Sequence, residues 1–250
     1  MEFDVFFFAV AIPAVLFAGI SKGGFGSGAA FASTPLLALI LDPGTAVAMM
    51  LPLLMVMDIA SLKPYWGKWD WPNSKALILG ALPGTAVGAA IFRVANADTL
   101  RVMIGLVALG FIAYQAARKL GWLSVTQKPF RPMMGGFWGF WGGITSFISH
   151  AGGPPVAVYL LSQKIDKTTY QATSVIVFWA VNWFKFIFYL MLGIFTFETA
   201  KADLMLAPFA VIGTYMGVYA HRIVPERAYF ILTYGMLLIA GSKLLFDGLT

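Results

Sequence analysis

The sequence predicts an all-α polytopic membrane protein made of two inverted repeats, each with about five hydrophobic segments. Three observations predict this fold class. Hydrophobic residues make up 60% of the 250 residues and charged residues only 11%, which is more apolar surface than a soluble domain of this size can bury. Apolar runs long enough to cross a bilayer as helices recur along the chain. The sequence also matches itself when it is shifted by 124 residues.

The hydrophobic segments follow one another with short polar breaks, and they do not alternate in polarity as the strands of a membrane β-barrel do. The acidic N-terminus lacks the basic region of a signal peptide, so the first segment is expected to remain as a helix. Because the second segment of each repeat is short, eight to ten spans are expected. The segments lie near 4–20, 28–41, 44–62, 75–93 and 99–117 in the first repeat, and near 133–148, 153–163, 169–195, 203–220 and 227–246 in the second.

The self-match defines the domain organisation. We expect a first membrane repeat over residues 1–120, a cytoplasmic linker over 121–131 and a second repeat over 132–250. Five segments is an odd number, so the second repeat must begin on the opposite side of the membrane and is therefore inverted. Among the residues aligned at this offset are Gly19 with Gly143, Asp42 with Asp166, and Asp58 with Asn182.

Basic residues are shared unequally between the two sides of this topology. By the positive-inside rule, the basic side faces the cytoplasm and both termini lie outside. The basic residues are dispersed over short loops, so lipids are an expected partner and nucleic acid is not. One side carries Lys63, Lys68, Lys75, Arg118, Lys119, Lys128, Arg131, Lys164, Lys167, Arg222 and Arg227, and the other only Arg93, Arg101, Lys201 and Lys243.

Each repeat begins with a break in its hydrophobic run, rich in glycine or proline. The first is Gly19-Ile20-Ser21-Lys22-Gly23-Gly24-Phe25-Gly26-Ser27-Gly28, and the second is Thr145-Ser146-Phe147-Ile148-Ser149-His150-Ala151-Gly152-Gly153-Pro154-Pro155. Unwound backbone is tolerated at membrane depth only where protein buries it or where it lines a wet cavity. The two breaks therefore predict a site between the repeats.

Lys22 places a cation inside the first break. Exposed backbone N–H groups beside an ammonium form a nest for an anion. We therefore expect Lys22, Gly23, Gly24 and Gly26 to bind a small anion. The alternative is a lysine whose side chain reaches the membrane interface.

The second break and a later segment supply further candidates. His150 could donate to an anion, carry a proton or bond carbonyls that the break leaves free. Asn182 and Lys185 are three residues apart and share one face of a helix, and a lysine this deep should face the protein interior. Lys185 could bind the anion or pair with Asp58. Asp58 and His150 are the candidates for proton coupling, because each can gain and lose a proton.

Several functions are disfavoured by the motifs that the chain lacks. It has no cysteine, no Walker P-loop, no EF-hand and no HExxH motif, so no metal, cofactor or ATP hydrolysis is expected. An enzyme is not expected, because an intramembrane hydrolase using Ser146 or Ser149 would lack a GxSG-like elbow. A passive anion channel remains the other alternative.

The two breaks, together with Thr34-Pro35-Leu36-Leu37 and the duplication, resemble the TauE/SafE family of sulfite and sulfonate exporters over nearly the whole chain. The resemblance implies a transporter of the bacterial-type inner (plasma) membrane that moves sulfite, sulfoacetate or related organosulfur and carboxylate anions, coupled to protons. Members of the family move these anions mostly outward and some import them, so the resemblance leaves the direction open. It implies substrate contacts at Lys22 and its flanking glycines, and at Ser149, His150, Gly152 and Gly153. It defines a class of substrate rather than one member, and it predicts no oligomeric state.

Overall fold

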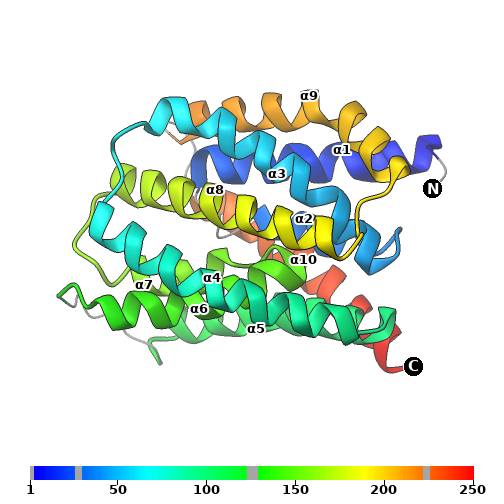
Figure 1. Cartoon of the computed structure of the whole chain (residues 1–250). Coiled ribbons are helices and arrows are strands. Elements are labelled where there is room, and N and C mark those ends of the chain that lie inside the picture. The colour runs from blue at the N-terminus through cyan, green and yellow to red at the C-terminus, as the bar shows by residue number, and fades with distance from the viewer. Residues whose placement is uncertain (1–2, 26–29, 123–128, 222–225) are drawn as a thin grey trace.

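The computed structural model describes residues 3–25, 30–122, 129–221 and 226–250, and for 226–230 only the backbone. All regular structure in these residues is helical. The long helices lie side by side as an elongated bundle (Figure 1). α1 begins and α10 ends at one end of this bundle, and α5 ends and α6 begins at the opposite end. We call these the terminus end and the linker end.

The helices lie where the hydrophobic segments predict them, within a few residues. The part of the chain that the sequence predicts as the first repeat forms α1 (Val5–Ile20), the π-helical turn η1 (Ser21–Phe25), the 3-10 turn η2 (Ala30–Ala32), α2 (Ser33–Leu37), α3 (Pro43–Tyr65), α4 (Trp71–Val94) and α5 (Ala97–Lys119). The second forms α6 (Pro132–Ser149), α7 (Gly153–Leu160), α8 (Lys167–Met191), α9 (Phe197–Ala220) and α10 (Glu226–Leu249).

Seven helical segments of the described chain are long and apolar enough to cross a membrane: α1 with η1, α3, α4, α5, α8, α9 and residues 231–249 of α10. The protein is therefore a multi-pass membrane protein. Helix α6 has 18 residues and lies along α4, and counting it with the seven gives the eight spans at the lower limit of the expectation. Helices α2 and α7, with 5 and 8 residues, are too short to cross a bilayer.

Short polar side chains begin most of the long helices. Each accepts a hydrogen bond from a backbone N–H in the first turn, which satisfies a donor that the helix itself cannot. The caps of α3 and α8 are Asp42 and Asp166, two residues that the self-match aligns. The other such caps are Asp4 of α1, Asp70 of α4, Asn96 of α5 and Thr196 of α9.

Glycines bring the first helix of each repeat against the fourth helix of the other. A Cβ on Gly217 of α9 would overlap the carbonyl of Ile20, and a Cβ on Gly84 of α4 would overlap the carbonyl of Phe140 in α6. Such close approach is how small-xxx-small motifs join membrane helices. Helix packing therefore accounts for the glycines of two motifs, Gly84-Thr85-Ala86-Val87-Gly88 and Gly213-Thr214-Tyr215-Met216-Gly217.

Helices from the two predicted repeats contact one another closely and do not form separate units. Besides the pairs α1 with α9 and α4 with α6, α3 contacts α8 and α5 contacts α10. Each of these pairs takes one helix from each repeat. We call the interface between α3 and α8 the α3–α8 seam. It lies within the bundle, because α3 also contacts α9 and α8 also contacts α4.

Candidate functional site

The second predicted break interrupts the helices, whereas the first begins as a change of helix type and its residues 26–28 lie outside the described chain. Helix α6 ends at Ser149, and His150 adopts a left-handed backbone conformation with φ of 56°. This conformation is uncommon for a residue with a Cβ, and it redirects the chain before α7 begins at Gly153. In the first repeat, α1 gives way to the π-helical turn η1 at Ser21.

Three successive backbone carbonyls of η1 are each held by a side chain from another helix. Bonds of this kind satisfy backbone groups where a membrane helix is interrupted. They come from α8, from the end of α3 and from the residue that follows α9. The carbonyls of Lys22, Gly23 and Gly24 accept from Gln171, Tyr65 and His221, respectively.

The Lys22 side chain turns into the α3–α8 seam. Its Nζ lies 2.7 Å from Oδ1 of Asp58, and the two side chains are 4% and 0% exposed. The other carboxylate oxygen of Asp58 accepts a hydrogen bond of 2.7 Å from Nδ2 of Asn182. Lys22 therefore does not reach an interface, and the carboxylate that was a candidate partner for Lys185 is paired with Lys22.

Lys185 lies in the same seam with different partners. Its Nζ is 2.7 Å from Nδ1 of His150, 3.3 Å from Oγ of Ser146 and 3.4 Å from Oδ1 of Asn182. Nε2 of His150 lies 2.8 Å from the carbonyl of Val47. Because a carbonyl only accepts, Nε2 carries a proton, and Nδ1 is then free to accept from Lys185 in a neutral imidazole.

These contacts join both repeats into one buried polar network with more positive than negative charge. The network runs from Lys22 through Asp58 and Asn182 to Lys185 and His150. Two ammonium groups face one carboxylate, so the network carries an excess of one positive charge when both lysines are protonated. Among the ion pairs of the described residues, none includes Lys185, which is fully buried.

The remaining predicted residues lie around this network or outside the described chain. A Cβ on Gly23 or Gly24 would overlap the carbonyls of Thr214 or Gly217 in α9, so helix packing also requires these glycines. Gly26 lies outside the described residues. Ser149, Gly152 and Gly153 are buried at the second break, where the Ser149 hydroxyl donates to the carbonyl of Thr145.

A hydrolase using Ser146 or Ser149 finds no support in these contacts. Both ring nitrogens of His150 are engaged, one by Lys185 and one by the carbonyl of Val47. The hydroxyl of Ser146 is bonded to Lys185, and that of Ser149 to the backbone of its own helix. His150 is therefore not placed to act as the base for either serine.

Sequence reasoning missed two tyrosines that hold the breaks. The Tyr65 hydroxyl donates to the carbonyl of Gly23 at 2.8 Å, and the Tyr189 hydroxyl donates to the carbonyl of Phe147 at 3.0 Å. Both bonds span 42 positions. The two tyrosines are 124 positions apart, and so are the two residues whose carbonyls accept, which is the offset of the self-match. The offset itself was therefore the signal that could have identified them.

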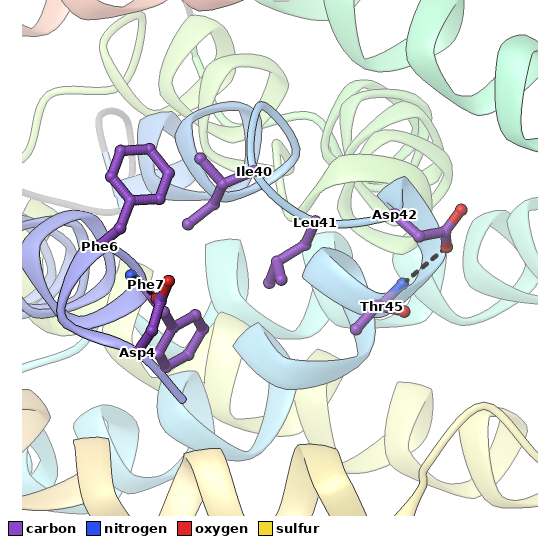
Figure 2. A pocket seen from close by; sticks show the side chains of 7 residues that line it. All are labelled: Asp4, Phe6, Phe7, Ile40, Leu41, Asp42 and Thr45. Carbon is purple, nitrogen blue, oxygen red and sulfur yellow. Dashed lines mark hydrogen bonds between the residues drawn. The ribbon is translucent and has the colours of Figure 1, made fainter. Parts of the chain in front are cut away.

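The two ends of the bundle carry cavities of opposite charge. The linker-end cavity has a volume of about 1100 Å³, and its lining includes Arg118, Lys119 and Lys167. The terminus-end pocket has a volume of about 370 Å³ and is lined by seven residues, among them Asp4 and Asp42. Figure 2 shows these two carboxylates at opposite edges of the terminus-end pocket.

The fold and the site define a multi-pass membrane protein that buries charge where broken helices meet, an arrangement typical of transporters. Comparison with known protein families identifies the transporter family. The chain belongs to the sulfite exporter TauE/SafE family, whose model matches residues 11–244. This is a family of membrane transporters rather than of enzymes, and its members' substrate is a small anion. Neither the curated proteins nor the solved structures contain a match to the chain.

Proposed function

We propose that the protein exports a small anion across the inner (plasma) membrane by alternating access, coupled to protons. The substrate class is sulfite, sulfonates such as sulfoacetate, and related organosulfur or carboxylate anions. The observation that carries this proposal is Lys185, fully buried with three neutral side-chain partners. A buried ammonium without a counter-charge costs several kcal/mol, so Lys185 either gives up its proton or is balanced by a bound anion. Membership of an anion-exporter family favours the anion.

The binding site proposed here combines Lys185 with Lys22, Asn182 and His150. A monovalent anion would balance the excess charge of the network, and its oxygens would accept from the ammonium and amide donors. To bind Lys22, the anion must compete with Asp58, which holds that ammonium at 2.7 Å. In this proposal Ser149 and the glycines of the two breaks lie at the edge of the site, where Gly23, Gly24 and Gly152 let neighbouring helices pack closely.

Proton coupling follows from the same competition. A proton on Asp58 would neutralise the carboxylate and free the Lys22 ammonium for the anion. A second proton on His150 would place a donor at Nδ1, facing Lys185, and would replace their contact by repulsion. Either protonation raises the positive charge of the site. Proton and anion therefore strengthen each other's binding and would leave the cell together.

The interlocked packing constrains how access could alternate. If one repeat rocked on the other as a rigid body, the glycine contacts between α1 and α9 and between α4 and α6 would have to break. Packed interfaces of this kind move as units rather than deforming continuously. We therefore propose that the moving bodies each contain helices of both repeats, and that they separate along the α3–α8 seam.

Export is tested with purified protein in liposomes loaded with methanesulfonate, the anion of a strong acid, which stays ionised over the useful pH range. Efflux should be accompanied by a rise of internal pH, and an outside-acidic gradient should drive uptake against the methanesulfonate gradient. Lys185→Met should abolish both fluxes. Lys201→Met, which removes an exposed partner of Glu198, is the matched control and should leave them unchanged. Flux that moves no protons and never accumulates the anion would identify a passive channel instead.

A further inference from the structure

The linker-end cavity brings solvent-accessible cations close to the buried network. Arg118 and Lys119 come from the last turn of α5, and Lys167 from the first turn of α8. All three line the cavity, together with the rings of Phe111 and Tyr234. Three basic side chains over an apolar wall focus a positive potential into the cavity.

The inner part of this cavity is formed by residues that hold the first break. Gly24, Gln171 and His221 all line it. Gln171 donates to the carbonyl of Lys22, and His221 donates to the carbonyl of Gly24. Two residues that line the cavity therefore contact the backbone of η1, the turn that carries Lys22 and its ion pair with Asp58.

The terminus-end pocket differs in both charge and position. Asp4 and Asp42 line it with five residues that carry no charge. Each aspartate also caps a helix, accepting from the N–H of Phe7 or of Thr45 (Figure 2). Thr45 and Asp58 are thirteen positions apart on α3, which is about 20 Å along the helix. The pocket therefore lies far from the ion pair and presents negative charge.

We propose that the linker-end cavity is a second anion site, through which the transported anion reaches Lys22 from the linker side. The proposal rests on the export function proposed above. Arg118, Lys119 and Lys167 raise the local concentration of anions in the cavity, and Gln171 and Gly24 connect this outer site to the turn that carries Lys22. The carboxylates at the terminus end lower the local anion concentration there, which disfavours rebinding after release.

Charge-selective labelling of single cysteines tests the cavity directly. The natural chain contains no cysteine, so Ala116→Cys introduces the only thiol, at an exposed position that lines the cavity. The thiol is modified with an anionic sulfonatoethyl or a cationic trimethylammonioethyl methanethiosulfonate. The rate of modification by the anionic reagent is divided by the rate for the cationic reagent, and this ratio is normalised to the same ratio for a free thiol in solution. The normalised ratio reports the local electrostatic potential at the cysteine. We expect the anionic reagent to be favoured about tenfold.

A matched cysteine at the other end provides the control. Thr45→Cys lies in the terminus-end pocket, which both aspartates also line, and it should favour the cationic reagent. In the Ala116→Cys protein, Arg118→Gln with Lys119→Gln should bring the normalised ratio close to one. Methanesulfonate should slow modification of Ala116→Cys and should not slow that of Thr45→Cys. Equal normalised ratios at the two positions, or no protection by methanesulfonate at Ala116→Cys, would overturn the proposal.

The labelling result separates this proposal from the export function. In Ala116→Cys with Lys185→Met, the anionic preference should persist, because the cavity cations are unchanged, whereas flux should be lost. Loss of flux without any anionic preference refutes the linker-end site alone. Persistence of flux in Lys185→Met refutes the proposed central site, whatever the labelling shows.

Discussion

The side-chain amide of Asn182 donates to the carboxylate of Asp58 at 2.7 Å, and the two residues are 124 positions apart. This is also the offset at which the sequence matches itself. Residues that are related by a two-fold axis can touch only near that axis. If the two repeats are related in this way, the axis passes close to the Asp58–Asn182 contact. The excess positive charge of Lys22 and Lys185 would then lie around the centre of the protein.

The ion pair between Lys22 and Asp58 predicts a non-additive mutant cycle. Lys22→Met alone leaves a buried carboxylate without its cation and should lower stability by roughly 3–5 kcal/mol. Lys22→Met combined with Asp58→Asn removes both charges and should recover most of the lost stability. Thermal unfolding in detergent, with the yield of monodisperse protein, measures the cycle.

The exposed pair of Lys201 and Glu198 is the reference for that cycle. Their side chains are 45% and 44% exposed, so Lys201→Met should cost less than about 1 kcal/mol. If Lys22→Met were as mild as Lys201→Met, the ion pair of Lys22 and Asp58 would not stabilise the buried network as described here.

The two tyrosine bonds predict equal effects at distant positions. Tyr65→Phe and Tyr189→Phe each remove one hydrogen bond to a carbonyl of a break, which should cost roughly 1 kcal/mol. Because the two hydroxyls occupy related positions, the falls in unfolding temperature should be similar, and they should add in the double variant. A large effect at one tyrosine and none at the other would contradict an equivalent role for the two breaks.

Glycines at the helix contacts should differ sharply from glycines in open positions. A Cβ on Gly217 or Gly84 would overlap a backbone carbonyl of a neighbouring helix, whereas a Cβ on Gly110 or Gly136 would meet nothing within 4 Å. Gly217→Ala and Gly84→Ala should therefore reduce the yield of folded protein severely. Gly110→Ala and Gly136→Ala should be neutral or stabilising by up to about 1 kcal/mol. Size-exclusion profiles of the four variants test this contrast.

The helices were predictable from the sequence because hydropathy and capping point to the same boundaries. A lipid-spanning helix needs an apolar run of fixed length, and Asp42 and Asp166 begin α3 and α8. The interlocking of the repeats was not predictable in the same way. Glycine spacing shows that a helix can be approached closely, but not which helix approaches it, and α9 could have packed within its own repeat.

The residues of the site were predictable from the sequence, but their contacts with one another were not. Lys22, Asp58, His150, Asn182 and Lys185 stand out because charged and polar side chains are rare in apolar segments. Their partners depend on how α3 and α8 face each other, which no local pattern encodes. Both Lys22 and Lys185 could have reached Asp58. The role of Gln171 was also hidden, because its partner is a backbone carbonyl, which every residue has.

The central claim is that buried, unbalanced positive charge at Lys185 binds the anion. The most direct test measures the unfolding temperature of purified protein in rising concentrations of sulfite and methanesulfonate, because a ligand that binds only the folded state raises it. For the natural protein we predict a rise that depends on the concentration of the anion. For Lys185→Met we predict no such rise, with an anion-free unfolding temperature that is equal or higher, because an uncompensated buried charge has been removed. The same anion-dependent rise in Lys185→Met would contradict the claim.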